Sequence, residues 1–422
     1  MLKIKYGNRH IVLKSSRESK LLLLWLMNIV TLTITRYILT QLNIYGITRT
    51  CVLVLVACLP IALFGINAMN MKTYKYSFFC CIYLLAVLTF CFSALLNDDL
   101  SYFFTRSNYG IERVFRPDSA IYALLFFSLL DNVDELYDTV NKFAYIDFVY
   151  LLVFQYLPAH LGGGWEDVTY NGTTVVRAYS LSFGYDMLFP TIIFIYLYMK
   201  KKNSFHLVLS AVGLILILTN GSRGALLMPI VFVGIMLING IANSSNTKWK
   251  WLKIFAIIIF VVILLVFGNI IVLKVADLLQ SLGFESRTLE MLGKGEISSD
   301  SGRSTIWEAV WTAIKNGGVF GYGAFGDRPF VYPIHFVGYS HNILLEMVCS
   351  FGIIGVLLIV IMIVKSVKML FFCKDNKYKE LFIIFFSISL QLLISMSFWY
   401  VWEFWATIAI AHKYFLKEKG RL

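Results

Sequence analysis

Charged residues are scarce in this sequence. Asp, Glu, Lys and Arg make up 15% of the 422 residues, and hydrophobic residues make up 59%. Soluble domains average roughly a quarter charged and just under half apolar residues. The scarcity of charge therefore excludes a soluble globular protein and indicates a polytopic membrane protein. The first apolar run is long and no small-residue cleavage site follows it, so we expect no cleavable signal peptide.

The apolar residues fall into runs of membrane-spanning length. A helix needs about 20 apolar residues to cross the hydrocarbon layer. The sequence therefore predicts an all-α integral membrane protein, with residues 1–422 as a single polytopic membrane domain and about twelve transmembrane helices. The predicted spans are 21–40, 50–68, 77–96, 117–132, 143–160, 181–199, 205–220, 225–242, 251–273, 341–364, 381–398 and 400–415.

Lysine is nearly absent from one side of this predicted topology. With both termini in the cytoplasm, the inner segments hold 21 Lys and 3 Arg, whereas the outer segments hold 3 Lys and 10 Arg. The excess of positive charge inside supports this orientation. Arginine presents a rigid fork of donors that suits phosphate and carboxylate groups. An outer face that uses arginine almost alone favours an anionic ligand there, although arginines that only extend toward lipid headgroups are the alternative.

Cysteine pairs and the motifs of nucleotide and metal chemistry are also missing. The seven cysteines lie in predicted spans or on the cytoplasmic side, and they show no metal-ligand spacing, so we expect neither a structural disulfide nor a metal site. No Walker, Rossmann, HExxH or GxSxG motif is present. We therefore expect no cofactor, and we expect no nucleic-acid partner.

One connecting segment is much longer than the others. Residues 274–340 form a predicted outer loop, and loops of that length are commonly functional or separately folded. Within it, residues 304–316 show the pattern of an amphipathic helix, with Thr305 and Glu308 in the positions of a capping box. Trp307 and Trp311 share its apolar face, which predicts a helix lying in the membrane interface.

Four polar segments on the outer side are candidates for chemistry. They contain Arg177 with Asp186, Arg223 in the tight turn TNGSRGALL, Arg303 at the start of the predicted interfacial helix, and His341 in YSHN. A charge in so short a turn as that of Arg223 is costly near hydrocarbon and is usually partnered. His341 titrates near neutrality and suits a general base. The alternatives are a snorkelling arginine, a solvated loop charge and a histidine that only hydrogen-bonds its helix end. His160 and His335 compete for the base role, and Glu166 and Asp186 are further candidates for a base or a partner.

The order of these motifs resembles the O-antigen ligase/polymerase superfamily. The match consists of SRGA between two spans, GRSxxW in the long outer loop, the element Gly321-Tyr322-Gly323, and HNxxLExxxxxGxxG at 341–355. It covers roughly residues 175–365. The chain lacks the proline that many members place just before the Gly-x-Gly element.

The resemblance implies a C-type glycosyltransferase that faces the periplasm or cell exterior and uses a glycan on undecaprenyl pyrophosphate. It assigns Arg223 and Arg303 to the diphosphate and His341 to the acceptor hydroxyl as a base or orienting group. Arg177 matches more loosely, and Tyr339 and Asn342 flank His341 as predicted substrate-binding residues.

From the residues and the resemblance together we expect an O-antigen or capsular repeat-unit polymerase in a bacterial cytoplasmic (inner) membrane. Its donor, undecaprenyl-pyrophosphate-linked oligosaccharide, is already activated, so the predicted reaction is a metal-independent inverting transfer. Further partners would be membrane lipid and a chain-length regulator protein. The alternatives are a ligase that transfers the glycan to lipid A-core and, from another class, a flippase or other transporter for the lipid-linked oligosaccharide. Transporters tend to show inverted repeats, which this sequence lacks.

Overall fold

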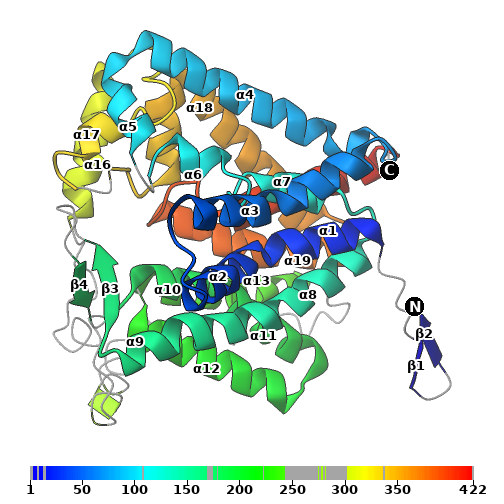
Figure 1. Ribbon diagram of the computed structural model, residues 1–422. Coiled ribbons are helices and arrows are strands. Elements are labelled where there is room, and N and C mark those ends of the chain that lie inside the picture. Colours follow the sequence, from blue (N-terminus) through cyan, green and yellow to red (C-terminus); the bar gives the residue numbers. More distant parts are fainter. Residues whose placement is uncertain are drawn as a thin grey trace.

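A computed structural model describes most of the chain, and its architecture is almost wholly helical (Figure 1). The described residues are 3–6, 9–12, 16–106, 109–168, 174–177, 179–221, 223–242, 274, 277–278, 281, 302–335 and 338–420. Two short antiparallel hairpins accompany the helices. β1 (Lys3–Tyr6) pairs with β2 (Arg9–Val12), and β3 (Trp165–Val168) pairs with β4 (Thr174–Arg177).

Five helical segments among the described residues are long and apolar enough to cross a membrane. They are α3 (Gly46–Ala68), α4 (Tyr74–Leu96), the run Val133–Leu161, the run Leu181–Lys201 and the run Ile343–Phe372. A sixth is possible if α1 (Arg17–Leu26) and α2 (Asn28–Gln41), which meet at a bend of 55°, count as one span. The chain is therefore a mostly helical, multi-pass membrane protein by its apolar helices. The predicted number of twelve spans is not confirmed.

The three runs are built from consecutive elements. Val133–Leu161 contains α8 (Val133–Tyr150), η2 (Leu151–Tyr156) and α9 (Leu157–Leu161), Leu181–Lys201 contains α10 (Leu181–Asp186) and α11 (Leu188–Lys201), and Ile343–Phe372 contains α18 (Ile343–Val367) and η3 (Lys368–Phe372).

Several predicted spans differ from the structure. The prediction for 117–132 is represented by α7 (Tyr122–Ser128), a seven-residue helix whose residues are all buried. This segment is apolar because it lies inside the protein, which hydropathy alone does not distinguish from contact with lipid. Two shorter apolar helices are α12 (Ser204–Asn220) and the part Gly224–Gly240 of α13 (Arg223–Ala242). Nearer the C-terminus lie α19 (Asn376–Ser389) with η4 (Leu390–Leu393), and α20 (Trp402–Glu418). The predicted span 251–273 lies outside the described residues.

The core is dense in aromatic rings and centres on α7, α11, α19 and α20. The ring of Trp402 alone meets Phe127, Phe189 and Phe385, with centroid distances of 6.1, 5.1 and 5.7 Å. By contrast, few residues of α3, α4 and the run from Ile343 are buried in the protein, as expected for helices whose apolar side chains face lipid. Polar side chains that are available for chemistry therefore lie at the ends of the bundle and in cavities within it.

Short elements gather at one end of the bundle, on the left in Figure 1. They include η1 (Asp98–Leu100), α5 (Ser101–Thr105), α6 (Ile111–Phe115), α16 (Arg303–Asn316), α17 (Arg328–Val331) and the β3–β4 hairpin. We call this the loop end. The N- and C-termini lie at the opposite side of the view.

The opposite end is held together by lysine ion pairs. Lys75 pairs with Glu18 at 2.9 Å and with Asp131 at 3.0 Å, and Lys413 also contacts Asp131. Lys417 pairs with Asp375 at 2.8 Å. We call this the lysine end. It is the end that the charge pattern predicts to be cytoplasmic, so the loop end is the predicted outer face.

Candidate active site

His341 lies at the loop end, in the residue pair that precedes α18. Its φ of 53° is in the left-handed region, which is uncommon for a residue with a side chain. Asn342 caps the helix: its Oδ1 accepts hydrogen bonds from the backbone amides of Leu344 and Leu345, at 3.0 and 3.3 Å. The Asn342 Nδ2 donates to the carbonyl of Leu393 at 3.2 Å. The Asn342 side chain therefore holds the start of α18, directly after His341, and a role in binding substrate stays a prediction.

The imidazole of His341 stands among aromatic and cationic groups. Its ring centroid lies 4.4 Å from that of Tyr339 and 5.5 Å from that of His335. Among the described residues, its Nδ1 is buried without a hydrogen-bond partner. Burial, followed by the charges of His335, Arg303 and Arg328, lowers the pKa of His341 to about 3. The imidazole is therefore neutral at neutral pH, with a nitrogen lone pair available.

A buried network of charged side chains supports the segment before His341. The backbone amide of Ser340 donates to Asp327 Oδ2 at 2.8 Å. Arg328 Nη2 reaches Glu346 Oε1 at 3.4 Å, and the Ser397 hydroxyl donates to the same oxygen at 2.5 Å. Each of these five residues is at most 2% exposed. Such charges are tolerated in the interior because they are paired with one another.

Tyr339 connects this network to the histidine. The Arg328 guanidinium lies 5.0 Å from the centroid of the Tyr339 ring and 4.6 Å from that of Phe325. The Tyr339 hydroxyl donates to the sulfur of Met396 at 3.7 Å. Tyr339 is thus packed between a buried cation and His341, a positioning role, and its predicted contact with substrate stays a prediction.

Arg303 is brought to the same place by α16. The helix begins at Arg303 after Gly302, which has a φ of 79°. It therefore starts two residues before Thr305, which lies within the helix and does not cap it. Ile306, Val310 and Ala313 are buried on one side, in a cluster with Val331 and Cys349.

The tryptophans of α16 differ in their surroundings. Trp307 Nε1 donates to the carbonyl of Ser340 at 3.0 Å, whereas Trp311 is 51% exposed. One of the two predicted interfacial tryptophans thus ties α16 to the histidine segment. The interfacial placement of the helix itself stays a prediction, as does the extent of the outer loop, since residues 282–301 lie outside the described part.

The SRGA turn packs tightly against neighbouring helices. A Cβ added to Gly221 would lie 2.8 Å from Gly184 Cα, and one added to Gly224 would lie 2.6 Å from the Tyr185 hydroxyl. Glycine is required at both positions for the turn to sit this close. Arg223 begins α13, and its side chain lies outside the described part of the structure.

The turn and the histidine segment meet at the same short stretch after α19. The added Cβ of Gly224 would lie 2.8 Å from Ile394 Cδ1, and Asn342 hydrogen-bonds the neighbouring Leu393. The amide of Ser180 donates to the carbonyl of Asn220 at 2.9 Å, which fastens the segment after Arg177 to the same turn. The structure thus brings the Arg177, Arg223, Arg303 and His341 segments to one end of the bundle and links them through direct contacts.

Residues 205–360, which include the turn, α16 and the HNxxLE segment, match the family model described as O-Antigen ligase. The match covers less than half of the 422 residues and supports the O-antigen ligase/polymerase superfamily for this chain. No curated protein matches the sequence. Members of this superfamily are glycosyltransferase-like enzymes, and the match supports a function of the O-antigen ligase/polymerase type.

The other sequence candidates lie apart from the superfamily motif. His160 stacks on Tyr156 in the α9 region, with ring centroids 5.6 Å apart, and Glu166 is exposed on β3. Asp186 opens into a separate cavity beneath the loop end. Of the two competing histidines, His335 is the one beside His341. The buried group Asp327, Arg328 and Ser397 was not singled out from the sequence, since nothing in the pattern FGDRPF indicates that its charges are internal.

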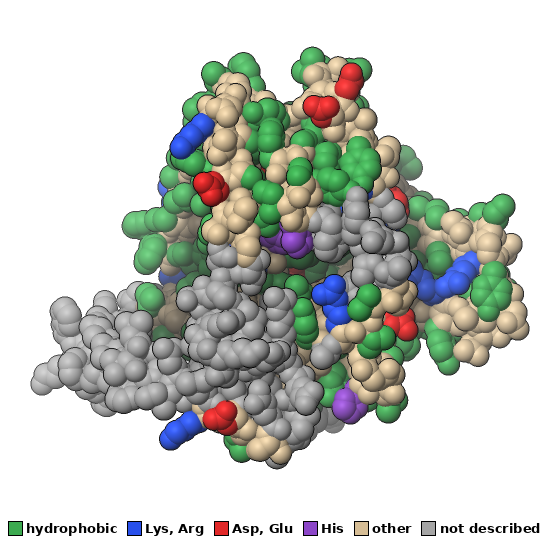
Figure 2. All heavy atoms as spheres, turned by 90° about the vertical axis from the view of Figure 1, so that its left-hand side faces the viewer, with side chains coloured by type: hydrophobic (Ala, Val, Ile, Leu, Met, Phe, Trp, Pro, Cys, Tyr) green, Lys and Arg blue, Asp and Glu red, His purple; other side chains and the backbone are tan. Residues whose placement is uncertain are grey.

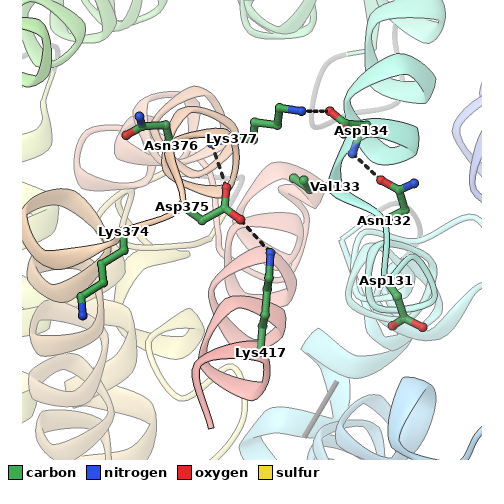
Figure 3. A pocket seen from close by; sticks show the side chains of 9 residues that line it. All are labelled: Asp131, Asn132, Val133, Asp134, Lys374, Asp375, Asn376, Lys377 and Lys417. Atoms are coloured by element: carbon green, nitrogen blue, oxygen red, sulfur yellow. Dashed lines mark hydrogen bonds and ion pairs between the residues drawn. The ribbon is translucent and has the colours of Figure 1, made fainter. Parts of the chain in front are cut away.

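The two ends of the protein differ in the charged side chains that they present. Figure 2 looks onto the loop end and shows histidine side chains at the middle of the face and nearer its lower edge, with Lys or Arg side chains between them. The hollow of about 710 Å³ at the lysine end is lined by Asp134, Asp375, Lys377, Lys417 and their neighbours. There Lys417 is joined to Asp375 and Lys377 to Asp134 (Figure 3). Since these charges neutralise one another, we place the candidate active site at the loop end.

Across the described ranges, no three His, Cys, Asp or Glu side chains are grouped closely enough to hold a metal ion.

Proposed function

We propose that this protein is an O-antigen or capsular polysaccharide polymerase. It transfers an undecaprenyl-pyrophosphate-linked glycan onto the terminal sugar of another lipid-linked repeat unit. The reaction takes place on the outer side of the bacterial cytoplasmic membrane. One observation carries the proposal: the helix that begins at Arg303 is joined to the His341 segment by the hydrogen bond from Trp307 to the Ser340 carbonyl, at the end of the bundle opposite the lysine pairs.

In the proposed reaction the acceptor hydroxyl attacks the sugar C1 of the donor. The new C1–O bond forms on one side while the bond from C1 to the diphosphate oxygen breaks on the other, so that the configuration inverts. His341 takes the proton of the hydroxyl, and the diphosphate leaves with the electron pair. Arg223 and Arg303 stabilise the charge that develops on this leaving group, and Arg177 contributes to binding it.

The lowered pKa of His341 fits a base that works only beside a bound donor. In the free protein, burial and the charges of Arg303 and Arg328 disfavour the imidazolium. An anionic diphosphate on the arginines would offset those charges and make the imidazole a stronger base. Proton transfer would then occur when both substrates are present and would be suppressed in their absence.

The choice of polymerase rests on the outer-loop motif GRSTIW and the Gly-rich run that follows it. A ligase that delivers the glycan to lipid A-core is the second candidate, because it would use the same arginine and histidine chemistry. A flippase or other transporter is less favoured, because the candidate residues gather at one end of the bundle and the sequence shows no inverted repeat. Membrane lipid and a chain-length regulator protein are the further proposed partners.

Deletion of the gene in its native strain tests the proposal, with the surface polysaccharide analysed on a gel. For a polymerase we expect core bearing a single repeat and no ladder. Bare core with long chains accumulating on the lipid carrier would identify a ligase instead. For the mechanism, we expect no trapped glycosyl-enzyme intermediate and no loss of activity with a chelator; either result would contradict direct, metal-independent displacement.

A further inference from the structure

A second cavity, of about 270 Å³, lies inside the bundle beneath the loop end. It is walled by the bend between α1 and α2, by α8, by α10–α11 and by the start of α20. Four acidic side chains line it, Asp118, Asp147, Asp186 and Glu403, together with Arg113 and Arg116, and Asp118 pairs with Arg116 at 2.5 Å. Asp147 and Glu403 are 8% and 6% exposed, whereas Asp186 is open to the cavity. Ionisable residues within membrane helices are costly and commonly mark functional sites.

Two side chains that carry hydrogen-bond donors also face this cavity, and among the described residues their donors make no hydrogen bond. Trp25 and Tyr185, which are 5% and 6% exposed, both line the cavity. Among the described residues, the indole Nε1 of Trp25 and the hydroxyl of Tyr185 make no hydrogen bond. No described hydrogen bond or ion pair satisfies the carboxylate of Asp147 either. Buried polar groups that lack partners in the protein are expected where a ligand supplies them.

The combination of groups restricts the ligand. An indole N–H can only donate, so it needs an acceptor atom, whereas a carboxylate needs donors. A metal cation would satisfy Asp147 and leave Trp25 unmatched. A ring that carries several hydroxyl groups satisfies both, because each hydroxyl donates and accepts. Aromatic side chains, including Trp402 with its centroid 6.3 Å from that of Trp25, offer flat apolar walls for the faces of such a ring.

The position of the cavity connects it to the transfer site. Met396, which lines the cavity, accepts the hydrogen bond of Tyr339, and Tyr339 packs on His341. On another side, Tyr185 abuts Gly224 of the turn that carries Arg223. The cavity therefore borders both segments to which the proposed reaction assigns roles. Its volume is just below the range of about 300–1,000 Å³ for drug-sized ligands, which suits one ring better than an oligosaccharide.

We propose that this cavity is a subsite for one uncharged sugar ring of the lipid-linked glycan, with Asp147, Asp186 and Glu403 accepting hydrogen bonds from its hydroxyl groups and Trp25 donating to one of its oxygens. The inference rests on the proposed function and adds a substrate class to it. Sugars that carry a carboxylate are disfavoured, because acidic side chains outnumber arginines by four to two in the lining.

Direct binding to the full-length protein in nanodiscs tests this subsite. The probes are the methyl glycosides of glucose, galactose and N-acetylglucosamine, with the methyl glycoside of glucuronic acid as the charged counterpart. We expect at least one neutral glycoside to change the tryptophan fluorescence saturably and to bind at least about tenfold more tightly than the uronide. Trp25→Phe should remove most of this signal, whereas Trp311→Phe, at an exposed position on α16, should keep it.

The carboxylates are tested with variants that conserve shape. Asp147→Asn and Glu403→Gln should each weaken binding by about tenfold, the value of one hydrogen bond to a charged acceptor. Asp138→Asn is the matched control, because Asp138 lies on the same helix as Asp147 but is exposed and pairs with Lys142. Elution as a single folded species establishes that each variant is intact. If one of these two variants fails to fold, glycoside binding by the other tests the prediction.

Three results would overturn the subsite: no saturable response to any neutral glycoside, equal binding of the uronide, or a response to sodium or potassium salt alone. The outcome is independent of the transfer reaction. If His341→Ala removes the polysaccharide ladder while Asp147→Asn leaves both the ladder and glycoside binding unchanged, the subsite fails and the transferase stands. If deletion of the gene leaves the polysaccharide unchanged, the proposed function fails whatever the cavity binds.

Discussion

Asp327 Oδ2 accepts a hydrogen bond of 2.8 Å from the backbone amide of Ser340, and both residues are fully buried. This bond anchors the residue that immediately precedes the left-handed backbone of His341. It joins the start of α17 to the start of α18 across thirteen residues of sequence. The orientation of the candidate base thus depends on a buried carboxylate that does not itself reach the ring.

We predict that Asp327→Ala weakens the fold and displaces His341. The substitution leaves the Ser340 amide and the Arg328 guanidinium with a lost partner, and removal of one member of a buried charged pair costs about 3–5 kcal/mol. The thermal unfolding midpoint of the purified protein should fall markedly, together with polymer synthesis. Asp138→Ala, at an exposed ion pair, is the control and should change neither. An unchanged midpoint in Asp327→Ala would contradict the positioning role.

Gly224→Ala should impair activity by moving the turn that carries Arg223. The new methyl group would come within 2.6 Å of the Tyr185 hydroxyl and 2.8 Å of Ile394 Cδ1, so the turn or its neighbours must shift. Gly234→Ala on the same helix meets nothing within 4 Å and serves as the matched control. Polymer length and yield measured in cells that carry each variant should separate the two.

The same contact predicts a partial rescue. Tyr185→Phe removes the oxygen that the methyl group of Gly224→Ala approaches most closely, so the double variant should regain part of the lost activity. Equal activity of Gly224→Ala and Gly234→Ala would show that close packing of the turn is not needed for transfer.

Arg303→Lys should lower the rate of transfer although it keeps the positive charge. Lysine lacks the planar fork of donors that binds a diphosphate in two places. Loss of a preorganised donor to a developing oxyanion costs about 10²–10³ in rate, and the retained charge should limit the loss toward the lower figure. Initial rates with a lipid-linked donor measure the effect. Lys315→Ala, at the other end of α16, should leave the rate unchanged, and a similar loss in both variants would contradict a specific role of Arg303.

His341 should make the protein less stable in acid. Its pKa is lowered from 6.5 to about 3 in the folded protein, so between these values the unfolded chain binds a proton that the folded chain does not. Acidification through this window therefore favours unfolding at this residue. His341→Gln should show a smaller drop in unfolding midpoint between pH 7.5 and pH 5 than the native protein. An identical drop in both would mean that the imidazole is not held neutral by its neighbours.

Sequence patterns predicted the starts of the helices at the site better than the buried charged network that supports them. The start of α16 lies at Arg303 and the start of α18 directly follows Asn342, close to the predicted 304 and 341. A polar residue next to an apolar run is a local signal, and Asn342 provides it for α18, whereas the capping box expected at Thr305 was wrong because α16 begins after Gly302. The network of Asp327 and Arg328 was missed because a charged pair in a Gly-rich segment looks solvent-exposed unless its tertiary partners are known.

The number of spans shows the other limit of the sequence. Residues 122–128 are as apolar as a membrane helix, yet α7 is a short, fully buried element among other helices. Hydropathy measures removal from water and does not tell a lipid neighbour from a protein neighbour. The bend of 55° between α1 and α2 forms part of the cavity wall. The residue at the bend is Met27, neither a proline nor a glycine, so no local sequence signal predicts the bend.

The central claim is that His341 serves glycan transfer on the outer face, and its replacement tests this most directly. A deletion strain is complemented with the native gene or with His341→Ala, and both the surface polysaccharide and the leaflet that holds the lipid-linked repeat are determined. The account predicts that His341→Ala gives core with a single repeat and no ladder, while the lipid-linked repeat still reaches the outer leaflet. A normal ladder, or a repeat retained on the cytoplasmic face, would contradict it, and the latter result would identify a transporter.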